Sequence, residues 1–269
     1  MPVDHYENFP VASILLPRRL RRPVELIYRF AREADDFADE GDLPEAVRLE
    51  NLRRYEDDLI RISRGESPLT PWFPELAALI ADRQLPVELF RDLLSAFAQD
   101  VVKKRYAGYP ELLDYCRRSA NPVGRLLLHL YGAASEENLH RSDAICSSLQ
   151  LINFWQDVAI DWQKDRVYIP QDDMQRFGVT EQFIATGNSS GPWWPLMAYQ
   201  VERTRTLMAS GEPLGRLLRG RIGLEMRMII AGGNRILDRI ESVRGDVFRH
   251  RPVLRRSDWL RMLARALLP

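Results

Sequence analysis

Two clusters of aspartate residues are the part of this 269-residue sequence whose types and spacing could do chemistry. The first cluster is Asp35, Asp36 and Asp39, and the second is Asp157 and Asp161. Residues four apart stack on one face of an α-helix with a rise of about 6 Å, so each cluster is expected to align its carboxylates. Like charges at this spacing destabilise a helix, and a bound cation would offset that cost.

Ligand sets made only of oxygen favour Mg²⁺, Ca²⁺ or Mn²⁺ over zinc. Mg²⁺ commonly takes one or two carboxylates and shares the oxygens of substrate phosphates. The sequence therefore predicts a pocket that binds a diphosphate through Mg²⁺ held between two facing helices. The alternative is that each acidic pair is a solvated helix face. The apolar residues interleaved with both clusters argue against that alternative, because carboxylates directed towards a core need a partner.

The elements that position these clusters are expected to be helices. Apolar periodicity, with Pro at helix starts and Gly at helix ends, predicts helices over 24–40, 44–63, 110–119, 122–134, 137–162, 192–209 and 213–241, and two more that begin near Pro74 and Pro86. Turn-forming residues predict loops over 65–74 and 186–192. Strand signals are nearly absent, since neither Asn-Gly nor Asp-Gly occurs and no apolar alternation is sustained. We therefore expect one all-α domain over residues 1–269, built as a bundle of about ten helices.

The composition excludes several classes of protein. Lys plus Arg and Asp plus Glu are equal at 38 each, so no excess charge favours a nucleic-acid partner. The two cysteines indicate a reducing, cytoplasmic compartment without a disulfide framework. No apolar run approaches the ~18 residues of a membrane span, and the first residues do not read as a signal peptide.

The segment 249–268 combines a basic and an apolar character. A short amphipathic helix is expected there, and Ser257 could cap it. Such a helix either docks on the domain or makes peripheral contact with the anionic inner face of a membrane, and both interpretations remain open. The basic residues are Arg249, Arg251, Arg255, Arg256, Arg261 and Arg265.

The motifs around the aspartates resemble the squalene/phytoene synthase family over most of the chain. The first motif, Asp35-Asp36-x-x-Asp39, follows Tyr28 and Arg32, and the second runs from Gln150 through Asn153, Asp157 and Asp161 to Arg166-x-Tyr168-x-Pro170. The stretch Asp100-x-x-x-x-Arg105-Tyr106, Tyr115 and the pair Val123-Gly124 also look like the family.

This resemblance implies an isoprenoid synthase fold, a helical bundle around a central cavity. It also implies an enzyme that uses Mg²⁺ and a C15 or C30 prenyl diphosphate substrate. The implied metal ligands are the five aspartates. The implied catalytic residues are Asp35, Asp39, Asp157, Asp161 and Tyr28. Substrate binding is expected at Asn8, Phe9, Arg32, Arg105, Tyr106, Asn153, Gln156, Arg166 and Tyr168.

Four positions depart from the usual family pattern. The family usually has Arg where this chain has Gln156, Gly where it has Asp165, Ala-Gly-x-Val-Gly where it has Ala120-Asn121-Pro122-Val123-Gly124, and Ser-Phe where it has Asn8-Phe9. These features resemble the branch that serves bacterial hopanoid biosynthesis. That branch implies conversion of presqualene diphosphate and water into hydroxysqualene and diphosphate, and an association with other enzymes of the pathway.

Physical arguments bear on which reaction is expected. Replacement of Arg by Gln156 removes one positive charge beside Asp157, which fits a reaction with one diphosphate better than a condensation of two. Asn121, Asn153 or Gln156 could hold the water that captures a carbocation. Asn121 is our candidate catalytic residue for this role, and its alternative role is a helix cap before Pro122.

The aromatic residues near the motifs have two open interpretations. Each ring could stabilise a carbocation through its π-face, or could simply fill the core. These rings are Phe9, Tyr28, Phe37, Phe154 and Trp155.

Other functions remain as alternatives. One is a head-to-head synthase that condenses two farnesyl diphosphates to presqualene diphosphate or squalene. A reductive squalene synthase would also need NADPH, for which no Gly-x-Gly-x-x-Gly fingerprint is present. A catalytically silent helical partner is disfavoured by the intact acidic motifs. A calcium-binding module is disfavoured because the chain has no EF-hand loop.

Overall fold

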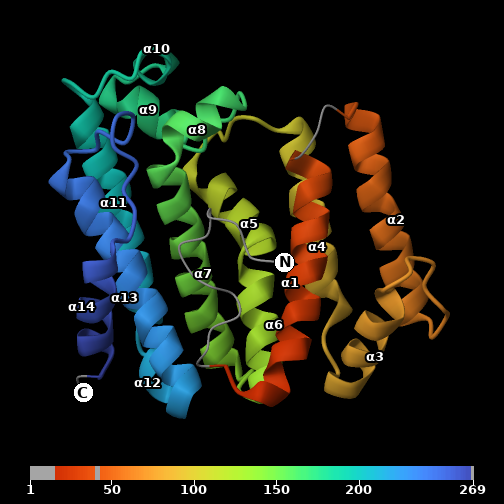
Figure 1. The fold of residues 1–269 in the computed structure, drawn as a ribbon. Coiled ribbons are helices and arrows are strands. Elements are labelled where there is room, and N and C mark those ends of the chain that lie inside the picture. The colour runs from red at the N-terminus through yellow and green to blue at the C-terminus, as the bar shows by residue number, and fades with distance from the viewer. Residues whose placement is uncertain (1–15, 40–42, 268–269) are drawn as a thin grey trace. The chain divides into compact units, whose positions relative to one another are not determined.

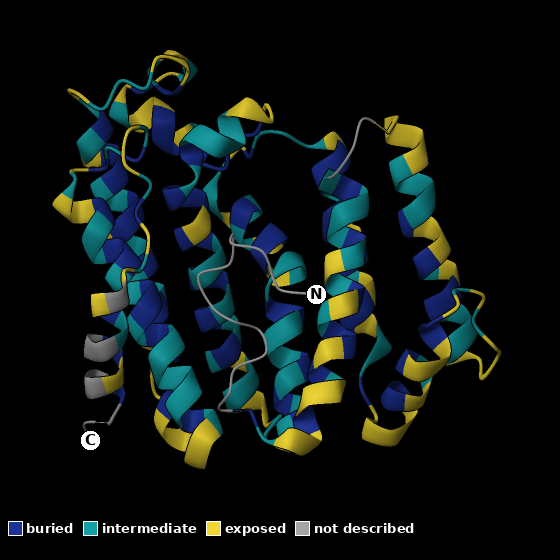
Figure 2. Cartoon of the chain, in the orientation of Figure 1, coloured by how far each residue is buried: buried dark blue, intermediate teal, exposed yellow. Residues whose placement is uncertain are grey.

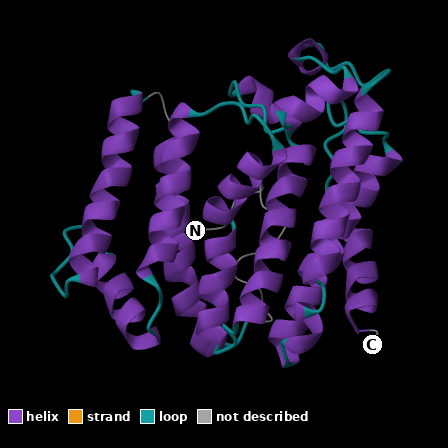
Figure 3. Ribbon diagram, turned by 180° about the vertical axis from the view of Figure 1, so that it is seen from behind, coloured by secondary structure: helices purple, strands orange, loops and turns teal. Residues whose placement is uncertain are grey.

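The structure, a computed structural model, describes residues 16–39 and 43–267. Every regular element in these two ranges is a helix, and they contain fourteen helices (Figures 1 and 3). The one pairing of extended backbone found there is an isolated parallel bridge between Arg105 and Val167. The predicted all-α class is therefore confirmed.

Contacts between residues divide the described chain into two compact units, which we call the N-terminal unit and the C-terminal unit. The N-terminal unit comprises residues 16–103 and 117–139, and the C-terminal unit comprises residues 104–116 and 140–267. Each unit is described by itself below. The single domain expected over residues 1–269 stays a prediction.

The N-terminal unit is built around an aromatic core. Its helices are α1 (Arg18–Asp39), α2 (Glu45–Ser63), α3 (Phe73–Arg83), α4 (Val87–Val102) and α6 (Asn121–Tyr131). Phe30 of α1 is fully buried, and its ring meets the ring of Phe90 of α4 edge to face at 5.1 Å. Tyr55 and Phe73 add rings from α2 and α3 at 5.6 and 5.9 Å from Phe30. This core fixes the helix that carries the first acidic cluster.

The C-terminal unit joins its helices through buried polar contacts as well as apolar packing. Its helices are α5 (Tyr109–Ser119), α7 (Glu136–Gln156), α8 (Val158–Gln163), α9 (Gln171–Phe177), α10 (Glu181–Ala185), α11 (Trp193–Gly211), α12 (Leu214–Leu217), α13 (Gly220–Ser242) and α14 (Arg256–Leu267). The end of α5 (117–119) and the start of α7 (136–139) are grouped with the N-terminal unit. The indole Nε1 of Trp155 donates to Thr204 Oγ1 at 2.8 Å, which ties α7 to α11 inside the core. Buried residues recur along the long helices α7 and α11 of this unit (Figure 2).

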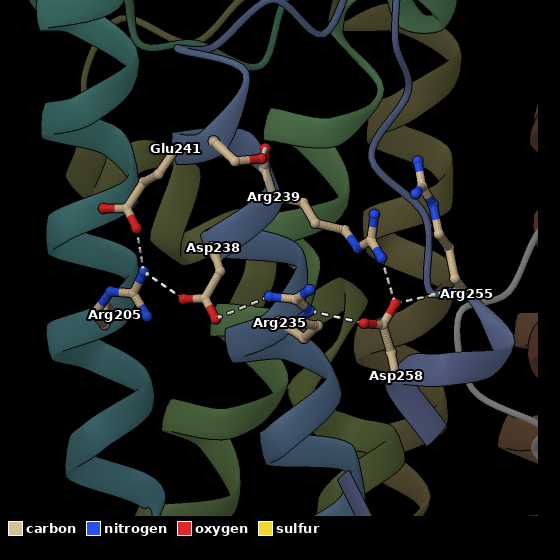
Figure 4. A network of polar contacts seen from close by, with 8 residues as sticks. Arg205, Arg235, Asp238, Arg239, Glu241, Arg255 and Asp258 are labelled. Atoms are coloured by element: carbon tan, nitrogen blue, oxygen red, sulfur yellow. Dashed lines mark hydrogen bonds and ion pairs between the residues drawn. The ribbon is translucent and has the colours of Figure 1, made fainter. Parts of the chain in front are cut away.

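The C-terminal helix α14 docks on α13 through a buried carboxylate (Figure 4). Asp258, 1% exposed, accepts hydrogen bonds from Arg235 Nε at 2.9 Å and Arg239 Nη2 at 2.5 Å. It also accepts from the backbone N–H of Arg255 at 2.7 Å, so Asp258 rather than Ser257 caps the helix start. Docking of this helix is therefore observed, while membrane contact stays a prediction.

Several predicted elements differ in their bounds. Helix α1 begins at Arg18, before Pro23, because the N–H of Leu20 bonds to the carbonyl of Pro17 at 2.9 Å and starts the first turn earlier. The helix predicted over 137–162 is interrupted at Asp157, where α7 gives way to α8. The helix predicted over 213–241 is α12 followed by α13. Helices α9 and α10 were not predicted, since helices this short carry little periodicity. None of the described helices is long and apolar enough to cross a membrane.

Candidate functional site

The first acidic cluster occupies the last turns of α1 in the N-terminal unit. Since α1 is helical from Arg18 to Asp39, Asp35 and Asp39 lie one turn apart on one face. Arg32 lies on the same surface, and its Nε is 2.9 Å from Asp36 Oδ1 while its Nη1 is 3.9 Å from Asp35 Oδ2. One arginine thus pairs with two carboxylates of the cluster.

The pKa of Asp35 reflects its burial and the carboxylates around it. Burial and, after it, the charge of Asp39 raise the pKa of Asp35 to about 7, against the opposing effect of Arg32. Asp100 of α4, which is 5% exposed, and Asp36 raise the pKa further. A divalent cation at this cluster would offset the repulsion between these carboxylates.

The second acidic cluster lies in the C-terminal unit, at the interruption between α7 and α8. Helical hydrogen bonding continues through it, because the N–H of Asp157 bonds to Asn153 O and the N–H of Asp161 bonds to Asp157 O, both at 2.9 Å. The two carboxylates are therefore held one turn apart. The Asp157 carboxylate also accepts two hydrogen bonds from Arg251, at 2.6 Å from Nε and 3.1 Å from Nη2.

Arg166 and Tyr168 follow this cluster through a strained turn. Asp165 has a left-handed backbone with φ +56°, and its carboxylate lies 2.9 Å from Arg105 Nη2. The Nε of Arg105 also donates to Glu181 Oε1 at 2.5 Å. Arg105 thereby fixes the turn that delivers Arg166 and Tyr168, both of which are buried. Substrate binding by Arg105 stays a prediction, since the contacts seen for its guanidinium hold the fold together.

Four aromatic rings gather next to the second cluster. Phe154 and Tyr168 are stacked, with ring centroids 3.7 Å apart and planes at 7°. Tyr106 and Tyr115 join them, with centroids 5.6 and 6.0 Å from that of Tyr168. The structure thus brings together Tyr106 and Tyr168, both predicted site residues, with Phe154, a predicted carbocation candidate. Trp155 instead fills the core of this unit, with its indole on Thr204.

The remaining predicted residues take different positions. Asn153 is exposed on α7, whereas Gln156 is 1% exposed and donates its amide to the carbonyl of Pro252. Tyr28 is half-buried on α1, one turn before Arg32. The roles assigned to these residues stay predictions.

Asn121 is buried as the first residue of α6, whose cap is Ala120 without a side-chain hydrogen bond. The helix-cap alternative for Asn121 is therefore not what the structure shows. Phe37 packs edge to face on Tyr55 at 5.1 Å. Asn8 and Phe9 lie outside the described residues.

The donor chemistry of both clusters fits Mg²⁺. Across residues 16–39 and 43–267, no three His, Cys, Asp or Glu side chains converge to form a metal site. Each unit instead offers carboxylates one helical turn apart, and Mg²⁺ commonly needs only one or two protein carboxylates when a phosphate supplies further oxygens. The structural sign that a cation would be favourable in the first cluster is the placement of Asp35 and Asp39 one helical turn apart.

Sequence reasoning missed two residues that act on the aspartates. Arg251 was interpreted only as part of the basic C-terminal segment, although it contacts Asp157 across 94 positions of sequence. Asp100 was noted as part of a family-like stretch, but its electrostatic effect on Asp35 requires the packing of α4 on α1. No local pattern in the sequence could have revealed either relationship.

Comparisons with known proteins agree with this fold. The crystal structure of squalene synthase HpnC from Alicyclobacillus acidocaldarius superposes with a TM-score of 0.82 and 36% identity, over 89% of this chain and 90% of that one. A dehydrosqualene synthase with a bound ligand superposes with a TM-score of 0.78 at 22% identity, over 94% of this chain and 87% of that one, which concerns the fold alone. The protein thus has the isoprenoid synthase fold.

The sequence comparisons define the family. The profile of the family Squalene/phytoene synthase matches residues 3–258. Hydroxysqualene synthase of Rhodopseudomonas palustris is 36% identical over 238 residues, which are 88% of this chain and 80% of that protein. Phytoene synthase of Arthrospira platensis is 28% identical over 97% of this chain and 87% of that protein. The chain belongs to the squalene/phytoene synthase family and is an enzyme of that family, whose members typically use Mg²⁺ with prenyl diphosphate substrates.

Proposed function

We propose that this protein converts presqualene diphosphate and water into hydroxysqualene and diphosphate, as an Mg²⁺-dependent enzyme of squalene and hopanoid biosynthesis. The observation that carries the proposal is the 36% identity over 88% of the chain with a protein named hydroxysqualene synthase. Two more proteins of that name are 32% and 34% identical. Phytoene synthases among the relatives are 26–30% identical.

The acidic clusters are assigned to the leaving diphosphate. In this proposal the carboxylates of each cluster hold Mg²⁺, and they are Asp35, Asp36 and Asp39 in the first cluster and Asp157 and Asp161 in the second. The metal, when bound, neutralises the negative charge that develops as the carbon–oxygen bond to diphosphate breaks. The like charges destabilise the metal-free clusters, but the same charges raise the affinity for the cation.

Two arginines are assigned to the diphosphate itself. A guanidinium donates two parallel hydrogen bonds to phosphate oxygens, which suits Arg32 and Arg166 to this role. Arg166 is 8% exposed, so its charge acts in a setting with reduced solvent screening. Arg32 already neighbours Asp35 and Asp36 in the N-terminal unit.

The carbocation left behind needs stabilisation without a nucleophile. The rings of Tyr106, Tyr115, Phe154 and Tyr168 present π-electron faces, which attract a cation without reacting with it. Water then adds its oxygen to the cation and loses a proton, which gives the hydroxylated product. Asn121, a buried amide at the start of α6, is our candidate for orienting that water.

Arg251 supplies a positive charge beside Asp157, where Gln156 carries none. The absence of Arg at position 156 suggested a site with one positive charge fewer, but Arg251 places a guanidinium on Asp157. Charge count therefore no longer separates a one-diphosphate from a two-diphosphate reaction. The second candidate function is condensation of two farnesyl diphosphates, which the similarity to phytoene synthases favours.

The deciding experiment is product identification. Purified protein would be incubated with Mg²⁺ and presqualene diphosphate, without NADPH, and the extracted lipid identified by mass spectrometry. A parallel reaction would contain farnesyl diphosphate, and Asp39→Asn would serve as the inactive control. Hydroxysqualene from the first reaction alone supports the proposal. Presqualene diphosphate from the second reaction would contradict it and establish the condensing synthase.

A further inference from the structure

Arg251 makes a bidentate contact with the carboxylate of Asp157, which the proposed function assigns to Mg²⁺. Its Nε lies 2.6 Å from Asp157 Oδ1 and its Nη2 lies 3.1 Å from Oδ2. The two side chains are only 27% and 20% exposed, so water screens the pair less than it would a surface ion pair. Both carboxylate oxygens are engaged, and a metal ion that binds them must compete with the guanidinium.

The segment that carries Arg251 is anchored on both sides. Before it, the indole Nε1 of Trp193 donates to Gly245 O at 2.8 Å, and the rings of Trp193 and Phe248 are 4.7 Å apart. After it, the carbonyl of Pro252 accepts a hydrogen bond from the buried amide of Gln156. The backbone contacts on both sides of Arg251 therefore position its side chain beside Asp157, in the loop between α13 and α14 (Figure 1).

The anchor Gln156 lies immediately before Asp157 in the sequence. Gln156 thus holds the loop through Pro252, and the next residue, Asp157, pairs with the Arg251 guanidinium of that loop. A side chain without an amide at position 156 would remove the hydrogen bond to Pro252 and loosen the approach of Arg251. This arrangement links the departure from the usual family arginine to the charge balance of the second acidic cluster.

We propose that Arg251 is the resident counter-ion of Asp157, that Mg²⁺ has to displace it, and that the loop held by Gln156 thereby sets the metal affinity of the second acidic cluster. The inference rests on the proposed function in one respect, namely that Asp157 binds Mg²⁺. It goes beyond that function because it names the group that opposes binding. Removal of Arg251 should therefore tighten Mg²⁺ binding, although it removes a stabilising contact from the fold.

The opposite signs of these two effects make the inference testable without substrate. Binding of Mg²⁺ to the purified full-length protein would be measured by calorimetry, together with the melting temperature in EDTA. Arg251→Gln is expected to bind Mg²⁺ about tenfold more tightly and to melt at a lower temperature without metal. Arg251→Lys keeps the positive charge but cannot make the bidentate contact. Its Mg²⁺ affinity should lie between those of the wild type and Arg251→Gln.

Matched variants separate this explanation from a general disturbance. Arg249→Gln removes an exposed arginine of the same loop, which pairs with Asp246, and should leave Mg²⁺ affinity unchanged. Gln156→Met, nearly the same size but unable to donate, should tighten binding about threefold through a loosened loop. Adding Asp157→Asn to Arg251→Gln should abolish the gain, which would assign it to this carboxylate.

Equal or weaker Mg²⁺ binding by Arg251→Gln would overturn the inference. If that variant does not fold, Gln156→Met decides the question on the same criterion. No prenyl diphosphate is present, so the result is independent of which product the enzyme forms. A protein that makes no hydroxysqualene but shows the expected gain would refute the proposed reaction alone, and the converse result would refute only the role of Arg251.

Discussion

The Asp165 carboxylate lies 2.9 Å from Arg105 Nη2, while the Asp165 backbone is left-handed with φ +56°. Glycine reaches this conformation at no steric cost, whereas other residues require about 1–2 kcal/mol, with Asp and Asn at the low end. Squalene/phytoene synthases usually carry Gly here. The ion pair with Arg105 gives a physical reason why Asp can replace Gly in front of Arg166.

Substitutions of Asp165 should therefore separate strain from ion pairing. Asp165→Ala loses the ion pair and keeps the strain, and is expected to destabilise by about 0.5–1 kcal/mol, or roughly 1–4 °C in melting temperature. Asp165→Gly loses the pair but relieves the strain, and should stay within about 0.5 kcal/mol of the wild type. Thermal unfolding at low and high salt measures both. Equal melting temperatures for the two variants would contradict this account.

The first acidic cluster should cost stability until metal binds. Asp35→Asn removes a charge one turn from Asp39 and near Asp100, so the metal-free variant is expected to be about 1 kcal/mol more stable in EDTA. With 10 mM Mg²⁺ the order should reverse, because only the wild type gains from binding. Asp82→Asn, at an exposed site on α3, is the matched control and should respond to neither condition. A stabilisation of Asp35→Asn that persists unchanged in Mg²⁺ would argue that the cluster binds no metal.

Asp258 should make the docking of α14 sensitive to acid. Burial acts to raise its pKa, but hydrogen bonds from the Arg255 N–H, Arg235 and Arg239 lower it to about 2, below the ordinary 3.8. The folded protein therefore favours the ionised form. Its contribution is complete above about pH 4 and is lost as the pH falls towards 2.

The measurement is the melting temperature of the wild type and Asp258→Asn between pH 7 and pH 2.5. The variant should be less stable by about 1–2 kcal/mol at pH 7, and the difference should shrink between pH 4 and pH 2.5. Asp238→Asn, which alters a more exposed carboxylate of α13, should show a smaller difference throughout. A gap between wild type and Asp258→Asn that is constant down to pH 2.5 would exclude this role for the charge of Asp258.

Local patterns predicted most of the helices because apolar periodicity and Pro and Gly signals are local properties. The helix that carries Asp35 and Asp39 and the backbone register of Asp157 and Asp161 were both expected from four-residue spacing. The short helices α9 and α10 were missed, since five to seven residues do not establish a period. The start of α1 was placed too late because Pro23 was interpreted as its first turn.

Arg32 pairs locally with Asp36, but other partners of the site residues could not be predicted because they come from distant segments. Arg251 reaches Asp157, and Arg105 reaches Glu181, only once the chain is folded. The hydrogen bond from the buried Gln156 amide to Pro252 O likewise forms only when these distant segments pack together. Sequence spacing thus identified which carboxylates are aligned, while tertiary packing brought Arg251 to Asp157.

Gly211 should be intolerant of even one added methyl group. An alanine Cβ at this position would lie 2.6 Å from the carbonyl oxygen of Arg141 and 2.6 Å from Ile145 Cγ1. The backbone oxygen cannot move without bending α7, so overpacking of about 1–3 kcal/mol should outweigh the roughly 1 kcal/mol that Ala gains as a helix former. Gly211→Ala is expected to melt several degrees lower, whereas Ser210→Ala at the neighbouring exposed site should be neutral. An unchanged melting temperature for Gly211→Ala would show that α7 and α11 can separate at little cost.

The stacked pair Phe154 and Tyr168 offers a test of carbocation stabilisation. Their ring centroids are 3.7 Å apart and Phe154 directly precedes the second acidic cluster along α7. Phe154→Leu keeps an apolar side chain of similar size but removes the π-face, so loss of packing should cost less than about 1.5 kcal/mol of stability. Loss of a desolvated cation–π contact of about 1–2 kcal/mol should lower kcat about five- to thirtyfold.

The two effects separate when turnover and binding are measured on the same variant. If the ring acts on the cation, kcat with presqualene diphosphate falls while the affinity for inorganic pyrophosphate with Mg²⁺ is unchanged, because pyrophosphate forms no cation. Phe177→Leu, which removes a ring packed on Tyr199 at 5.5 Å in the same unit, controls for generic loss of an aromatic residue and should leave kcat unchanged. If kcat instead falls equally in both variants and follows their melting temperatures, Phe154 contributes through packing alone, and the stabilising face must be sought among Tyr106, Tyr115 and Tyr168.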